Sequence, residues 1–235
     1  LVFRYAREIG NRYAEMVHEL ERLEQLEGGE LRVHALVHVG ASLVMPAVER
    51  FVAEHPQVEL QLSFDDSPLD FYKGGLDLAV TVGLPRAPQL VVHKLCPNDV
   101  CIVAAPRLAA RHKTPTTPTD LLSWPLVAYK SGDVEVTTWP YEQDGAIHAL
   151  EIKPNVTVNN GESLRVAVLR GLGVGYLSRF SAMAELRCGD LVELLPEVTL
   201  PPYESVYTVK SDVALVSPRV EAFEACLRSV ALELT

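Results

Sequence analysis

Adjacent carboxylates are the first candidates for chemistry in this sequence. Asp65 and Asp66 open the stretch DDSPLDFYKGGLDLAVTVG, residues 65–83. Two carboxylates can act as general acid and base, or they can bind a metal ion. Catalytic pairs usually come from separate elements that face one cleft, whereas neighbours on a strand point to opposite faces of the sheet. The spacing therefore does not favour an acid/base pair.

The residues around this pair are typical of a helix start. Asp66 or Ser67 stands where an N-cap belongs, and Pro68 follows at the first helical position. A double glycine ends the segment. We expect a two-turn helix over 67–73, and we expect the carboxylates to serve capping and turn formation.

Histidines and cysteines are the other candidates. His34 and His38 lie four residues apart on a predicted strand and could share one face, but zinc would need a third and a fourth ligand. We interpret them as core or cleft histidines. The cysteines form no C-x-x-C pair and are expected to be reduced thiols, so a redox role has little support; they are Cys96, Cys101, Cys188 and Cys226.

Nucleophile and phosphate motifs are missing from the sequence. It contains no G-x-S-x-G elbow and no G-x-x-x-x-G-K loop. GLGVG at 171–175 resembles a dinucleotide fingerprint, but it follows a predicted helix and enters a strand, which is the reverse of the required order. We expect no catalytic residue, no metal ion and no cofactor.

Composition narrows the class of protein. The 235 residues are 48% hydrophobic and 22% charged, as in ordinary globular domains. The net charge of −10 is a poor match to nucleic acid, which needs clustered Lys and Arg. The sequence holds no apolar run long enough to span a membrane, and it does not begin with the apolar segment of an export signal. We expect a cytoplasmic protein with no membrane partner.

The first 27 residues have the pattern of a long helix with one narrow apolar seam. The seam residues are spaced alternately by four and three, and they are Val2, Ala6, Ile9, Tyr13, Met16, Leu20 and Leu23. Such a seam could pack back on its own domain or against a second subunit. We favour the second subunit, because a narrow seam is typical of a coiled-coil stripe.

Strands and helices alternate from Leu31 onward. LRVHALVHV predicts a strand with one apolar face, and the following segment predicts a helix with Val44, Phe51 and Val52 at helical spacing. Further strands are expected over 58–64, 76–82 and 90–105. This alternation predicts an α/β fold with a parallel sheet and right-handed crossovers.

The second half continues with shorter elements. Thr119 or Asp120 could cap a short helix, and EIKPNVTVNN (151–160) predicts a strand. A helix should begin after Asn160 and stop at Gly171. The last helix should begin at Pro218, with the preceding serine as its N-cap.

Taken together, these segments resemble the effector-binding domain of LysR-type transcriptional regulators, preceded by the linker helix of that family. Seven segments carry the resemblance in order, and they are GGELRVHA, MPAVERFVAEHPQVELQL, DDSPLDFYKGGLDLAVTVG, LVVHKLCPNDVCIVAAPRLAARHKTPTTPTDLL, VNNGESLRVAVLRGLGVGYLS, GDLVELLP and VSPRVEAFEACL.

The resemblance implies two Rossmann-like subdomains of the type II periplasmic-binding-protein fold, joined by two crossover strands. The expected parts are a linker and dimerisation helix over 1–29, subdomain I over 30–104 and 207–235, and subdomain II over 105–206. The winged helix-turn-helix of the family, which would contact DNA, should precede residue 1. The resemblance also implies homodimers or homotetramers.

A small-molecule effector is the partner that the resemblance implies, bound where strand ends and helix starts converge between the subdomains. Helix starts favour an anion, so a small carboxylate, with an aromatic one as a candidate, is the expected ligand. Its binding should close the subdomains. The expected contact residues are His38, Val39, Gly40, Ser42, Ser67, Pro68, Arg86, Tyr129, Asn159, Asn160, Gly161 and Ser178.

Two other function classes share this type of fold. A solute-binding protein of a transporter would need an export signal and would have no use for a dimerising helix. An enzyme would need a convergent nucleophile or acid/base pair. We therefore expect a regulatory sensor and not an enzyme.

Overall fold

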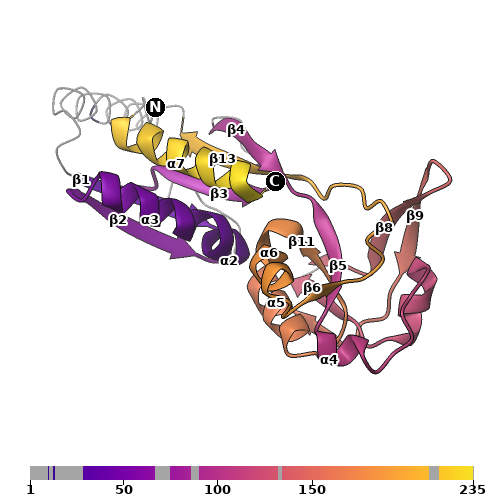
Figure 1. Cartoon of the computed structure of the whole chain (residues 1–235). Helices are drawn as coiled ribbons and strands as arrows, with labels where there is room; N and C mark the ends of the chain where they lie inside the picture. The colour runs from indigo at the N-terminus through magenta and orange to yellow at the C-terminus, as the bar shows by residue number, and fades with distance from the viewer. Residues whose placement is uncertain are drawn as a thin grey trace. The chain divides into compact units, whose positions relative to one another are not determined.

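The computed structural model describes residues 10, 13, 29–66, 75–85, 90–131, 134–211 and 217–234. These residues form two compact units (Figure 1). Unit 1 holds the described residues up to Leu36 together with Leu43–Cys96 and Val206–Glu233. Unit 2 holds Val37–Ser42 and Pro97–Ser205, with Leu234. The expected division of the chain into a linker helix and two effector subdomains stays a prediction.

Unit 1 is built on a five-stranded sheet in the order β2-β1-β3-β13-β4. Its strands are β1 (Gly29–Ala35), β2 (Val58–Phe64), β3 (Leu78–Val82), β4 (Leu90–Pro97) and β13 (Ser205–Ser211). β1 runs parallel to β2 and β3, as the alternation of strands and helices predicts, whereas β13 is antiparallel to β3. Leu31, Val33 and Ala35 are buried on one face of β1, which confirms the apolar face predicted for that part of the strand.

Two helices of unit 1 pack beside each other, α3 (Met45–Glu54) and α7 (Pro218–Leu234) (Figure 1). The rings of Phe51 and Phe223 meet edge to face, with centroids 5.3 Å apart, and both side chains are fully buried. Arg50 on α3 donates hydrogen bonds to Ser229 and Glu233 on α7. α7 begins at Pro218, as predicted.

Unit 2 contains two short three-stranded sheets and a hairpin. The sheets have the orders β10-β6-β7 and β11-β5-β12, and the hairpin pairs β8 with β9. The strands are β5 (Val100–Ala104), β6 (Val127–Ser131), β7 (Val134–Glu135), β8 (Thr138–Gln143), β9 (Ala146–Glu151), β10 (Val156–Val158), β11 (Gly175–Ser178) and β12 (Val192–Glu193). A parallel bridge between Leu126 and Val174 connects the two sheets. The helices are α2 (Val37–Val39), α4 (Pro106–Ala109), the 3-10 helix η2 (Pro118–Ser123), α5 (Gly161–Leu169) and α6 (Arg179–Cys188).

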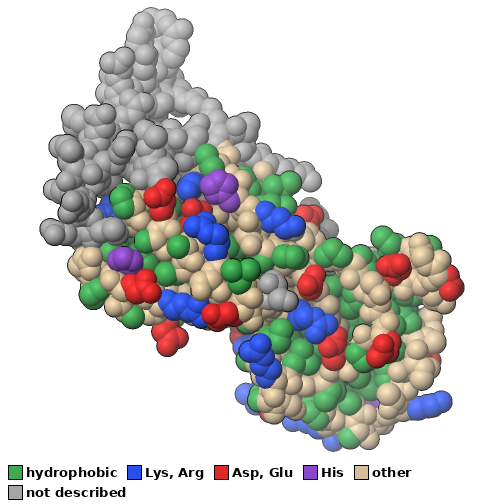
Figure 2. Space-filling model, turned by 45° about the horizontal axis from the view of Figure 1, so that its top comes forward, with side chains coloured by type: hydrophobic (Ala, Val, Ile, Leu, Met, Phe, Trp, Pro, Cys, Tyr) green, Lys and Arg blue, Asp and Glu red, His purple; other side chains and the backbone are tan. Residues whose placement is uncertain are grey.

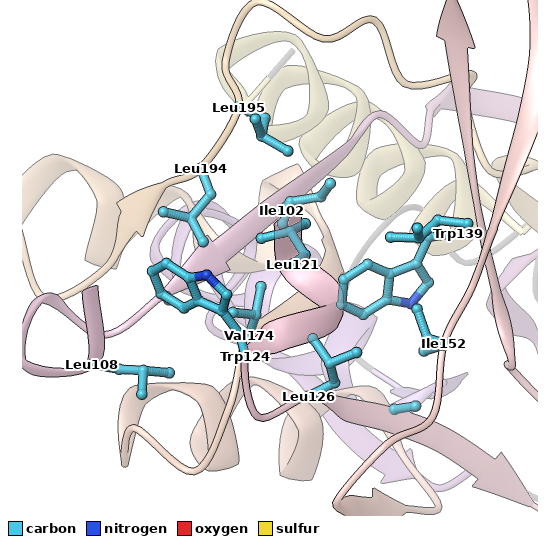
Figure 3. Packing of buried hydrophobic residues seen from close by; sticks show 13 residues of the cluster. Ile102, Leu108, Leu121, Trp124, Leu126, Trp139, Ile152, Val174, Leu194 and Leu195 are labelled. Carbon is cyan, nitrogen blue, oxygen red and sulfur yellow. The ribbon is translucent and has the colours of Figure 1, made fainter. Parts of the chain in front are cut away.

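The core of unit 2 surrounds two buried tryptophans. Trp124 and Trp139 lie on either side of Ile102, Leu121 and Val174 in Figure 3, and all five are at most 5% exposed. A second cluster lies under α5 and includes Leu164 and Val168. Packing of this kind supplies most of the stability of short helices such as α5.

The first predicted strand is shorter than expected. It ends at Ala35, and Val37 and Val39 are helical, followed by the π-helical turn η1 (Gly40–Val44) that leads into α3. The sequence pattern is ambiguous here, because Val39 fits the two-residue period of the strand and also the helical series of buried residues Val39, Leu43, Val44, Ala47 and Phe51. The helical series prevails. Val52, expected on the apolar face, is 45% exposed.

Two local predictions in the second half are corrected by the structure, and one element was not predicted. Thr117 caps η2, and Asp120 is its third residue, which accepts back from the N-cap backbone in a capping box. The strand expected over 151–160 is interrupted, because Pro154 lacks an N–H group and Asn155 donates its own to Leu126. The hairpin β8–β9 was not predicted, although its turn residues Asp144 and Gly145 have the positive φ angles typical of a two-residue hairpin loop.

Other predictions fall on residues outside the described ranges. These are the helix over 67–73 and nearly all of the N-terminal helix over 1–27, of which Gly10 and Tyr13 are described and helical. Within the described residues, every helix is too short or too polar to cross a lipid bilayer.

Candidate functional site

The start of α5 is the part of the predicted site with the clearest geometry. Asn160 is the N-cap, as predicted, and its Oδ1 accepts a hydrogen bond of 2.7 Å from the backbone N–H of Ser163. Its Nδ2 donates to Oδ1 of Asn159 at 3.2 Å. Asn159 itself is exposed. The cap leaves the positive end of the α5 dipole beside two adjacent amide side chains.

His38 covers this helix start. A β-carbon placed on Gly161, the first residue of α5, would lie 2.7 Å from Cγ of His38. Real β-carbons do not approach other atoms so closely, so glycine is the residue that the imidazole tolerates there. His38 belongs to the segment Val37–Ser42, which groups with unit 2.

The same imidazole stacks on Phe180, the second residue of α6. The ring centroids lie 5.8 Å apart, with 12° between the planes, and Phe180 is 6% exposed. Ser178 precedes α6 as its N-cap residue, and no side-chain capping bond is formed there. The backbone oxygen of Ser178 accepts from the hydroxyl of Ser181. His38 therefore contacts the first turns of both α5 and α6.

Phe180 is a neighbour of the candidate site that was not predicted from the sequence. Its position two residues after Ser178, within the first turn of a predicted helix, was a usable signal, because aromatic side chains at helix starts can reach a neighbouring helix start. The contact with His38 depends on a segment 142 residues earlier in the chain, which no local pattern reveals.

Tyr129 lies on β6, next to the strand that leads into this site. Its register partner is Val158 on the parallel strand β10, one residue before Asn159. Its side chain is half-buried. Tyr129 thus aligns with the end of β10.

The remaining predicted residues divide into described and undescribed ones. Val39 is fully buried and Gly40 is buried, so Val39 offers a ligand only its backbone, while Ser42 is half-buried. Ser67, Pro68 and Arg86 lie outside the described residues. The described members of the predicted set all belong to unit 2.

The charges at the two helix starts are paired within the protein. Arg179, the first residue of α6, donates to both carboxylate oxygens of Glu193, and these hydrogen bonds raise its pKa. Arg165 on α5 donates to Glu162 and to Glu185, and the bond to Glu162 is the largest cause of its raised pKa. Both arginines are therefore fixed cations with carboxylate partners, and the helix starts themselves carry the positive potential at the site.

The other residues considered for chemistry have structural roles. His34 lies on β1, with its Nδ1 3.0 Å from Oγ of Ser63, whereas His38 is helical, so the two histidines do not share a strand face. Asp77 accepts from the backbone N–H of Arg32 at 2.8 Å, which ties β1 to the turn before β3. Among the described residues, no three His, Cys, Asp or Glu side chains are grouped to hold a metal ion.

The described cysteines are free thiols, three of them buried. Burial is the main cause that raises the pKa of Cys101 to about 12. A thiol with so high a pKa is protonated at neutral pH and is a poor nucleophile.

The visible surface shows mixed charge. On the face in Figure 2, Lys and Arg side chains are interspersed with Asp and Glu over the described residues. A broad basic stripe, the usual footprint of nucleic-acid binding, is not seen on that face among those residues.

Comparison with known proteins identifies the family of this chain. The sequence pattern of the LysR substrate binding domain matches residues 24–232. The HTH-type transcriptional regulator DmlR of Escherichia coli K12 is 28% identical over 200 residues, which are 85% of this chain and 65% of DmlR. The chain thus spans less than two thirds of the length of this curated relative.

Solved structures share the fold. CrgA, a LysR-type transcriptional regulator from Neisseria meningitidis, superposes with a TM-score of 0.79 at 23% identity, covering 97% of this chain and 77% of that one. The effector domain of AmpR from Pseudomonas aeruginosa gives 0.71 at 21% identity, covering 87% and 96%. These neighbours have the two-subdomain fold of the periplasmic-binding-protein kind, as predicted from the resemblance. The chain belongs to the LysR substrate-binding-domain family.

Proposed function

We propose that this chain is the effector-sensing domain of a LysR-type transcriptional regulator and that it binds a small organic anion at the start of α5. The observation that carries the proposal is the start of α5, where the consecutive residues Asn159 and Asn160 place two hydrogen-bonded amide side chains beside the helix N-terminus, in a family named for substrate binding. The amide groups can donate hydrogen bonds, and the helix dipole favours negative charge. Ser42, Tyr129 and Ser178 are the proposed additional contacts.

The whole protein would then regulate transcription in the cytoplasm. DNA contact would come from a helix-turn-helix (HTH) domain of the type for which DmlR is named, and that domain would lie outside these 235 residues. The relatives are regulators, which supports sensing over transport and over catalysis. Binding of the effector would change how the two units are held and, through them, the DNA-binding domains.

A screen of small organic acids by thermal shift tests the anion site. We expect at least one carboxylate to raise the melting temperature. Asn160→Asp is the informative variant, because aspartate keeps the N-cap acceptor and so preserves helix stability while placing a negative charge at the site. Affinity for the acid should fall about tenfold or more, since a like charge within the site repels it.

Asn155→Ala is the matched control. Asn155 is another hydrogen-bonded asparagine of unit 2, whose Oδ1 accepts from Leu126 at 3.0 Å, and it is not one of the predicted site residues. Its loss should lower stability and leave acid affinity unchanged. If Asn160→Asp and Ser42→Ala both bind the acid as tightly as the natural sequence, the placement of the site is wrong. If only neutral or cationic compounds bind, the proposal that the ligand is an anion is wrong.

We also propose that the protein forms homodimers or homotetramers through the apolar seam of residues 1–27 and through its effector domains. Sedimentation of the full chain and of a version lacking 1–27 tests this at tens of micromolar. The full chain should sediment as an oligomer and the shortened one as a smaller species. Two monomers would contradict the proposal.

A further inference from the structure

His38 lies over the start of α5, where the effector is proposed to bind. Its imidazole lies directly over Gly161, so closely that a β-carbon there would be 2.7 Å from Cγ and 2.8 Å from Nδ1. Asn160, the proposed anion contact, is the preceding residue. A ligand group that reaches the backbone of the first turn of α5 must therefore share this space with the imidazole or replace it.

The imidazole of His38 also stacks on the ring of Phe180. Its plane is 12° from that of Phe180, with centroids 5.8 Å apart, which is an offset parallel stack. Phe180 is 6% exposed, so the phenyl face that His38 covers is closed to solvent. His38 itself is half-buried, on a three-residue helix that precedes a π-helical turn. If the imidazole turned away, this face of Phe180 would be exposed, so another flat ring is needed to cover it.

We propose that His38 is a built-in occupant of the effector position and that a planar aromatic carboxylate displaces it. The ring of the ligand would replace the imidazole on Phe180, and its carboxylate would lie at the start of α5. The inference rests on the proposed function for the carboxylate. The stack on Phe180 is the reason to expect a planar ring in the ligand. The close approach to Gly161 is the reason to expect that the ligand displaces His38.

Displacement of His38 and direct contact of His38 with the ligand predict opposite changes in ligand affinity when the imidazole is removed. If His38 must leave, binding costs the His38–Phe180 stack, and His38→Ala abolishes that cost. Since aromatic pairs differ from ordinary contacts by about 0.5–1.5 kcal/mol, affinity should rise about threefold to tenfold. If His38 contacts the ligand, the same variant should bind more weakly.

The experiment is calorimetric titration of the 235-residue chain with benzoate and, separately, with cyclohexanecarboxylate, which has the same ring size and charge but is not flat. We expect benzoate to bind His38→Ala about threefold to tenfold more tightly than the natural sequence. Cyclohexanecarboxylate should bind more weakly than benzoate to both proteins. His38→Phe keeps a stackable ring and should bind benzoate no better than the natural sequence.

His148→Ala is the matched control. His148 also stacks on an aromatic ring of unit 2, that of Tyr141 on the hairpin, with centroids 5.6 Å apart and 25° between the planes. Its removal should leave benzoate affinity unchanged. In NMR spectra of the natural protein, benzoate should shift the His38 ring resonances, which the Phe180 ring current now displaces, and leave those of His148 in place.

The outcomes separate this inference from the proposed function. Benzoate binding that weakens or stays unchanged in His38→Ala overturns the displacement and leaves the anion site standing. If cyclohexanecarboxylate binds both proteins as tightly as benzoate does, the planar ring of the ligand is overturned. If neither acid binds either protein and Asn160→Asp changes the affinity for no organic acid, the proposed site and the inference fail together.

Discussion

The carboxylate of Glu224 on α7 lies 3.0 Å from the ammonium of Lys210 on β13, with their side chains 4% and 9% exposed. Thr208 donates a second hydrogen bond of 2.7 Å to the other carboxylate oxygen. Burial alone would raise the pKa of Glu224, but the hydrogen bonds from Thr208 and Lys210 outweigh it, and the pKa is lowered. An ionised glutamate therefore ties the last helix to the returning strand of unit 1.

Glu224→Ala should destabilise the protein by about 3 kcal/mol, because it leaves a buried ammonium and a buried hydroxyl without their acceptor. Urea unfolding measures the change. Lys130 and Glu135 form the matched exposed pair, 2.7 Å apart with side chains 49% and 37% exposed. Glu135→Ala should cost less than about 1 kcal/mol. Similar losses in the two variants would mean that burial adds nothing to the first pair.

Asp120 should make stability depend on acid pH. Backbone N–H groups of Thr116 and Thr117 hydrogen-bond its carboxylate and lower its pKa from 3.8 to about 2. Because the folded pKa lies below the unfolded one, the contribution is present above pH 4 and is lost as the pH falls from about 4 to 2. Melting temperatures should fall across this window less steeply in Asp120→Asn than in the natural sequence.

The origin of that shift can be checked with salt. Hydrogen bonds from backbone amides are its main causes, and ions screen hydrogen bonds far less than they screen distant charges. The difference between Asp120→Asn and the natural sequence should persist in about 0.5 M sodium chloride. Its disappearance there would point to long-range charge instead.

Gly173→Ala should destabilise unit 2 by about 1–3 kcal/mol. A β-carbon at Gly173 would lie 2.8 Å from the backbone oxygen of Pro125 and 2.9 Å from the carbonyl carbon of Leu126, and backbone atoms cannot rotate away. Gly189 is the control, because nothing lies within 4 Å of its β-carbon position and its φ is +83°. Gly189→Ala should cost about 1 kcal/mol from backbone strain alone. Chemical denaturation compares the two, and a smaller loss for Gly173→Ala would refute the close-packing argument.

Tyr176→Phe should leave stability unchanged or raise it by about 1 kcal/mol. The hydroxyl of Tyr176 is buried and has no hydrogen-bond partner among the described residues, while its ring stacks on Trp139 at 5.8 Å. Burial is the main cause that raises its pKa, which is the same desolvation that the phenylalanine avoids. A loss of stability above about 1 kcal/mol would show that a bound water satisfies the hydroxyl. Thermal unfolding of the two proteins decides between these results.

Local pattern determined many elements of this protein by itself. Asn160 and Pro218 were predicted as helix starts because capping and proline geometry act within one turn of the chain. The strand at 58–64 was predicted in full, since alternation has a period of two residues and needs no distant partner. The order of seven family segments indicated the two-subdomain fold.

Where local signals conflict, or where interacting residues are far apart in the sequence, only the tertiary structure determined the outcome. Val39 satisfies strand and helix periods alike, and its burial in the helical series with Leu43 and Ala47 settles the matter. The stack of His38 on Phe180 and the ion pair of Lys210 with Glu224 join different elements, so their geometry follows from packing and not from spacing. For this reason the sequence predicted His38 as a site residue, while its place over the start of α5 became known only from the fold.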